Sequence, residues 1–203
     1  MKPITNFKAE YSNSDFAPLP SGAYVAVIKG AKVENNNGNE ALVLAVDVAE
    51  GEYKDFFAKR FAADKQSAQQ NNNNNNQPVK WKGTYRMPIP RDGVAEDAWK
   101  LRNLSNGIAA IQMSNENYLW GWDENTLSGK FVGINVHERE WEWEDKSGVT
   151  TEIGMLCPVD DVRNGKVKPM KMRALKKNGI TIATGNPAKP SAFFEEIHET
   201  LPF

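Results

Sequence analysis

The sequence is poor in cysteine and histidine and has no long apolar run. Cys157 is the single cysteine among 203 residues, so no disulfide can form within one chain. A reducing, cytoplasmic compartment is therefore expected, and a thiolate zinc site is excluded. The first fifteen residues lack the apolar core of a signal peptide, and no stretch reaches membrane-spanning length. We expect a soluble protein that makes no membrane contact.

Enzyme signatures are also missing. The two histidines, His137 and His198, are far apart and have no partner at metal-ligand spacing. The sequence has no Walker loop, no GxGxxG and no GxSxG. We predict no catalytic residue, metal or cofactor. Two alternatives stay open, namely an adaptor that binds no nucleic acid and a nucleic-acid-processing enzyme with a carboxylate site at Asp47, Asp160 and Asp161.

Charge is balanced in total but uneven along the chain. There are 25 Lys and Arg against 26 Asp and Glu, a net charge of −1. Residues 160–177 hold seven basic residues against two acids, whereas the last eleven residues carry a net charge of −3. This asymmetry indicates a nucleic-acid surface beside an acidic tail. A merely solvated basic edge would look the same.

Runs of strong β formers separated by turn residues predict strands. A helical spacing of apolar residues appears once, over residues 94–113, at Trp99, Leu101, Leu104, Ile108 and Ile111. Six consecutive asparagines at 71–76 place a mobile loop at residues 63–79. The predicted strands cover residues 22–33, 41–48, 52–61, 80–89 and 129–145, with a hairpin partner at 149–156.

This order of elements predicts the fold. Three strands, an elaborated loop with an extra strand, one helix and a two-strand hairpin match a mainly β fold. The expected form is an OB-fold-like, five-stranded antiparallel barrel with one helix between strands 3 and 4. Residues 1–20 are assigned to an arm, 21–177 to the barrel domain, and 178–203 to a flexible linker with an acidic tip.

Residues 19–160 resemble a family of small phage replication-module proteins that are regarded as OB-fold single-strand binders. The matching segments are LPSGAYVAVIKGAKV, VAEGEYKDFFAKRF and LSGKFVGINVHEREWEWEDKSG, and the Asn-rich insertion departs from the pattern. The resemblance implies binding of single-stranded DNA in replication or recombination.

The stretch HEREWEWE is the sharpest internal signal. Side chains alternate between the two faces of a strand, so His137, Arg139, Trp141 and Trp143 share one face. Single-strand binders combine aromatic faces for base stacking with cations for phosphates, as this face does. A second interpretation places the two tryptophans in the core, behind an acidic solvent face. Two earlier segments repeat the cationic and aromatic pattern, adding Lys54, Phe56, Arg60, Lys80, Lys82 and Arg86 as nucleic-acid-binding candidates.

The last eleven residues, FFEEIHETLPF, resemble the acidic tip of bacterial single-stranded DNA-binding proteins. That resemblance implies docking of the terminal aromatic residue and its carboxylate on replication or recombination proteins. An amphipathic helix is the alternative, because Phe193, Ile197 and Leu201 are spaced four apart. The predicted partner-binding residues are Glu195, Glu196, Glu199, Leu201, Pro202 and Phe203.

Overall fold

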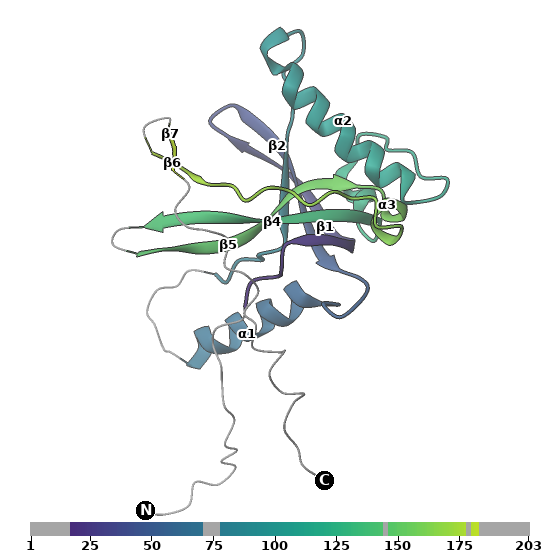
Figure 1. Cartoon of the computed structure of the whole chain (residues 1–203). Helices are drawn as coiled ribbons and strands as arrows, with labels where there is room; N and C mark the ends of the chain where they lie inside the picture. The colour runs from purple at the N-terminus through teal and green to yellow at the C-terminus, as the bar shows by residue number, and fades with distance from the viewer. Residues whose placement is uncertain (1–16, 71–77, 144–145, 178–179, 183–203) are drawn as a thin grey trace, which may run out of the picture.

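A five-stranded antiparallel sheet organises the computed structural model, which describes residues 17–70, 78–143, 146–177 and 180–182 (Figure 1). The strand order is β3-β2-β1-β4-β5, so β3 and β5 are the two edges. The sheet strands are β1 (Gly22–Asn36), β2 (Asn39–Val48), β3 (Thr84–Pro88), β4 (Phe131–Trp143) and β5 (Lys146–Cys157). A separate ribbon pairs β6 (Leu175–Lys177) with β7 (Ile180–Ile182). The predicted mainly β class is confirmed.

The first hairpin forms as its sequence predicts. Asn37 and Gly38 both have positive φ, 52° and 79°, as a two-residue hairpin turn of type I′ requires. Asn36 then pairs with Asn39, and the register continues inward along β1 and β2. A bulge between Ile28 and Gly30 interrupts this ladder, and residues 22–27 of β1 also pair with β4. One long strand therefore joins both halves of the sheet.

The predicted third strand at 52–61 is wrong, because this segment enters helix α1 (Phe56–Gln70). Asp47 at the end of β2 accepts hydrogen bonds from the backbone N–H groups of Phe57 (2.9 Å) and Ala58 (3.3 Å). The first N–H groups of a helix lack partners within it, so a carboxylate there stabilises the helix start. The predicted loop at 63–79 is also wrong over its first part, since α1 continues to Gln70; residues 71–77 lie outside the described part.

The helix predicted between strands 3 and 4 is confirmed as α2 (Ala98–Met113), which follows the 3₁₀ turn η1 (Ala95–Asp97). Leu104, Ile108 and Ile111 are buried, whereas Trp99 and Leu101 are exposed. Gly107 interrupts the helical pattern for a packing reason. A Cβ atom at that position would collide with the Met87 sulfur of β3. The missing side chain therefore lets α2 approach the sheet closely.

The apolar core lies between α2 and one face of the sheet. Alternate residues of β2, namely Leu42, Leu44, Val46 and Val48, are each at most 1% exposed. Ile28 of β1 and Ile134 of β4 join the same cluster. Leu19, which the sequence analysis assigned to the arm, is 2% exposed and packs there too. The folded domain therefore begins before the predicted boundary at residue 21.

The predicted hairpin near the end of the domain is confirmed as β4 and β5. A short helix, α3 (Val159–Arg163), follows, and residues 166–174 then return along β4; we call these residues the strap. Arg173 N donates to Glu138 O (2.8 Å), and Glu140 N donates to Arg173 O (3.0 Å). Asn135 Nδ2 also donates to Lys168 O at 2.9 Å. In Figure 1 the segment after α3 runs back beside β4 toward β6.

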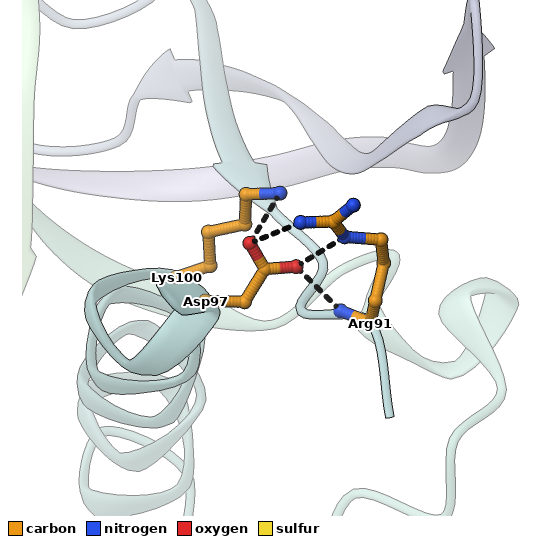
Figure 2. A network of polar contacts seen from close by, with 3 residues as sticks. All are labelled: Arg91, Asp97 and Lys100. Carbon is orange, nitrogen blue, oxygen red and sulfur yellow. Dashed lines mark hydrogen bonds and ion pairs between the residues drawn. The ribbon is translucent and has the colours of Figure 1, made fainter. Parts of the chain in front are cut away.

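The loop before α2 is fixed by a buried carboxylate, shown in Figure 2. Asp97 is 4% exposed, and its Oδ2 accepts from Arg91 N (2.9 Å) and Arg91 Nε (2.8 Å). Its Oδ1 lies 3.0 Å from Lys100 Nζ, one helical turn onward. Hydrogen bonds from Arg91 hold the pKa of Asp97 well below its usual range. The network ties the end of the β3 segment to the start of α2.

Candidate nucleic-acid interface

A polar cleft of about 750 Å³ opens where the two edges of the sheet face each other. Its walls are β3 on one side and β5 with the end of β4 on the other, and α1 and the strap add further side chains. Edges β3 and β5 are not neighbours in the hydrogen-bonded order of the sheet. The space that a β3–β5 ladder would fill is therefore lined with side chains instead.

The lining of the cleft is strongly cationic. It includes five Arg and Lys side chains but a single carboxylate, that of Glu152. The cations come from four parts of the chain, since α1, the β3 region, β4 and the strap all contribute. They are Arg60, Lys82, Arg86, Arg139 and Arg173. A concave surface lined with one sign of charge attracts polyanions.

Glu152 on β5 forms ion pairs with part of this positive charge. Its Oε1 lies 3.0 Å from Arg173 Nη1 and 3.4 Å from His137 Nε2. Its Oε2 lies 3.3 Å from Arg139 Nε. His137 is 6% exposed, so it lies in the floor of the cleft, whereas the two arginines reach solvent. One carboxylate therefore gathers three basic groups from β4 and the strap.

The other side of the cleft retains unpaired cations. Arg86 pairs with Glu34 at 2.5 Å. Within the residues that the structure describes, Arg60 and Lys82 form no ion pair. Buried Arg60 Nε, Asn103 Oδ1 and His137 Nδ1 lack a hydrogen-bond partner in this same part of the chain, and all three residues line the cleft. Buried polar groups normally have partners, so these atoms mark a site with capacity for a polar ligand.

Aromatic side chains form part of the cleft wall. Phe56 is half-buried and packs edge-to-face on Phe57 with 5.3 Å between ring centroids. Phe57 and Tyr85 are buried, 7% and 8% exposed. Phe56 is therefore the lining aromatic with the most accessible ring. Its place at the start of α1 puts it on the same helix as Arg60, four residues apart and thus on one face.

The structure brings six of the ten predicted nucleic-acid-binding residues into this one cleft: Phe56, Arg60, Lys82, Arg86, His137 and Arg139. Phe56 and Arg60 come together for a reason other than the predicted one, since they share a helix face rather than a strand face. Lys54 and Lys80 are exposed but do not line the cleft.

Trp141 and Trp143 continue the face of β4 that carries His137 and Arg139, but they lie beyond the cleft, toward the end of the β4–β5 hairpin. The Trp141 ring lies over Gly148 of β5, where an added Cβ would come within 3.1 Å of it. Trp143 is 72% exposed. Neither is a fully buried core residue. On the opposite face, Glu140 is 5% exposed and accepts from Leu175 N at 3.1 Å, so that face is not simply an acidic solvent surface.

Sequence reasoning missed Glu152 and Arg173 as members of this site. Glu152 sits in VTTEIGML, which reads as an ordinary hairpin strand. Arg173 belongs to the basic stretch that the charge count singled out, but nothing in the sequence pairs it with β4. The parallel bridge between Arg139 and Arg173 brings the strap to the cleft. Such long-range pairing has no local signal.

The structure shows where the three carboxylates of the alternative enzyme hypothesis lie. Asp47 is fully buried and binds backbone N–H groups at the start of α1. Burial raises its pKa, and the N–H donors from Phe57, Val48 and Ala58 oppose that rise. Asp160 and Asp161 lie in the first turn of α3. Across the described ranges, no group of three or more His, Cys, Asp or Glu could hold a metal ion.

The predicted partner-binding residues Glu195, Glu196, Glu199, Leu201, Pro202 and Phe203 lie outside the described residues. Within the described residues, no helix has the length and apolar character needed to cross a membrane. Comparison with protein-family models and with curated proteins finds no match for this chain.

Proposed function

We propose that this protein binds single-stranded DNA, with the strand lying in the cleft between β3 and β5. The observation that carries the proposal is the composition of this cleft, which is lined by five Arg and Lys side chains, by Phe56 and by a single carboxylate. Unpaired strands offer phosphates to such cations and open base faces to such rings. A rigid duplex keeps its bases stacked inside, so the aromatic part of the site favours the single strand.

The topology supports the finer proposal of an OB-fold. Central β1 pairs with both β2 and β4, and the helix α2 falls between β3 and β4. A five-stranded, partly open Greek-key barrel has these features, and such barrels bind oligonucleotides on the face of strands 2 and 3 and at the loops joining strands 1–2 and 4–5. Here Arg86 on β3 and the Trp143 end of the β4–β5 hairpin occupy comparable places.

The first test compares single-stranded and duplex DNA of one sequence by tryptophan fluorescence titration. We expect tighter binding of the single strand, weak base preference, and an affinity that falls as salt rises, because phosphate contacts release counterions. Equal affinity for the duplex, or an affinity independent of salt, would contradict the proposal. Loss of the nucleic acid during incubation with a divalent metal would instead favour a nuclease.

We also propose that the acidic segment 193–203 recruits replication or recombination proteins. Its supports are the sequence features Glu195, Glu196, Glu199 and Phe203 and their contrast with the basic cleft. Deleting 193–203 should abolish partner capture while single-strand binding is retained or slightly tightened at low salt. Phe203→Ala should nearly reproduce the loss of capture. Unfolding of the truncated protein would show that the segment packs as a helix instead.

A further inference from the structure

Three basic groups in the cleft converge on the Glu152 carboxylate. Arg173 Nη1 lies 3.0 Å from it, Arg139 Nε 3.3 Å and His137 Nε2 3.4 Å. Two of these groups project from β4 and the third from the strap, so they approach the carboxylate from separate segments. Three basic groups around one carboxylate, of which Arg173 donates a hydrogen bond to it, form a site that suits an oxyanion of similar size.

The strap does not need this carboxylate to stay on β4. The strap is already fixed to β4 by the backbone hydrogen bonds of Arg173 with Glu138 and Glu140. The side chains of Glu152, Arg139 and Arg173 are 28%, 44% and 67% exposed, and exposed ion pairs contribute little to stability. Glu152 therefore matters more for the charge of the cleft than for the architecture of the hairpin.

A phosphodiester carries the same charge as a carboxylate and offers two non-bridging oxygens as acceptors. Two anions cannot share the same three donors without strong repulsion at this distance. We propose that Glu152 occupies the position that one backbone phosphate of the strand takes in the complex. On binding, this phosphate displaces the carboxylate from Arg139, Arg173 and His137. This inference rests on the proposed single-strand binding.

Displacement also sets which ligands bind. A ligand with one phosphate must expel Glu152 and gains only the three donors that Glu152 releases. A strand places further phosphates near Arg60, Lys82 and Arg86, which line the same cleft. These additional contacts offset the loss of the internal ion pairs. Glu152 therefore acts as a specificity residue that favours polymeric anions over small ones.

The test is the isosteric variant Glu152→Gln, which keeps the shape and removes the charge. Binding of a labelled oligothymidylate is measured by anisotropy over a series of NaCl concentrations. We expect roughly tenfold tighter binding at low salt and a plot of log K against log[NaCl] that is steeper by about 0.7. In the wild type the displaced Glu152 carboxylate stays beside the strand and offsets the charge gained from one neutralised phosphate, and the variant lacks that carboxylate. Inorganic pyrophosphate should also compete more effectively with the strand on this variant than on the wild type.

Glu50→Gln is the matched control, because Glu50 pairs with Arg163 at 2.5 Å and neither residue lines the cleft. It removes the same charge and should leave the slope unchanged. Adding Arg173→Ala to Glu152→Gln should return the slope to the wild-type value. This double variant provides a second, independent measurement of whether a phosphate binds at Arg173.

Three outcomes would overturn the inference. An unchanged slope for Glu152→Gln would show that no phosphate takes the place of Glu152. Weaker binding by a folded Glu152→Gln protein would show that the carboxylate holds the arginines in a binding position. Wild-type protein that binds no single strand would refute the proposed function as well, whereas wild-type binding with either of the first two results refutes this inference alone.

Discussion

At the scale of single residues, replacing Trp143 distinguishes a tryptophan that stacks on bases from one that packs in the core. The side chain is 72% exposed at the end of β4, so few neighbours depend on it for packing. We expect Trp143→Ala to leave the melting temperature close to that of the wild type and to weaken single-strand binding by roughly 1–3 kcal/mol, the range for loss of one stacked base. Thermal melts and titrations on the same preparation measure both effects.

Trp99→Ala provides the control for this prediction. Trp99 on α2 is 59% exposed and does not line the cleft, so its truncation should change neither stability nor binding by much. A loss of roughly 3–5 kcal/mol of stability in Trp143→Ala would instead be the signature of a buried aromatic residue. Equal losses of affinity in both variants would point to a non-specific effect.

Some of the residues that line the cleft could be predicted from the sequence, and others could not. Arg139, Lys82 and Arg86 stand in strand-like segments with a period of two, and the cleft lines up these side chains as that period predicts. The burial of His137 could not be predicted, because it results from the strap and β5 packing against β4. Glu152 could not be recognised either, since its role depends on Arg173, which is 21 residues away and belongs to an irregular segment.

At the scale of elements, the network around Asp97 makes the start of α2 sensitive to acid. The pKa of Asp97 is lower in the folded state than the value of about 3.9 for an unfolded chain, so in acid the unfolded state binds more protons. The stability that Asp97 contributes is therefore present above about pH 4 and is lost as the pH falls further. Melting temperatures measured over an acid pH series should show this loss.

Asp97→Asn should be less stable than the wild type at neutral pH, because Arg91 and Lys100 lose their shared partner. Below about pH 4 the difference from the wild type should narrow, since protonation removes the same charge. Glu96→Gln is the control, as Glu96 is the exposed neighbour in the same turn. A constant difference between Asp97→Asn and wild type at every pH would contradict the assigned role.

Helix α1 shows why one element escaped sequence analysis. Its first residues, FFAKRF, are rich in aromatic residues that favour strands, and the polyasparagine run nearby suggested a loop. The deciding interaction is distant, because Asp47 of β2 caps the helix from ten residues away. A local signal did exist, because Phe57 and Phe61 are four residues apart, which places them on one face of a helix. In the structure, Phe61 packs on Trp81 with 5.5 Å between ring centroids.

At the scale of the whole molecule, antiparallel pairing between chain neighbours was predictable and pairing between distant segments was not. Hairpins β1–β2 and β4–β5 follow from alternating strands with turn residues between them. The β1–β4 ladder and the return of the strap join residues more than a hundred and about thirty positions apart, respectively. Alternation alone does not specify such partners. The cleft arises from these distant pairings, so its position could not be predicted.

The strap also bears on how the molecule meets copies of itself. Pairing of β1 with β4 ends at Val136, and from His137 onward that edge of β4 would present bare N–H and C=O groups. Exposed strand edges invite another chain to add a strand, which is a common route to aggregation. Arg173 satisfies the backbone of Glu138 and Glu140 on this edge. The strap therefore closes this edge of β4 to strand addition by a second copy of the protein.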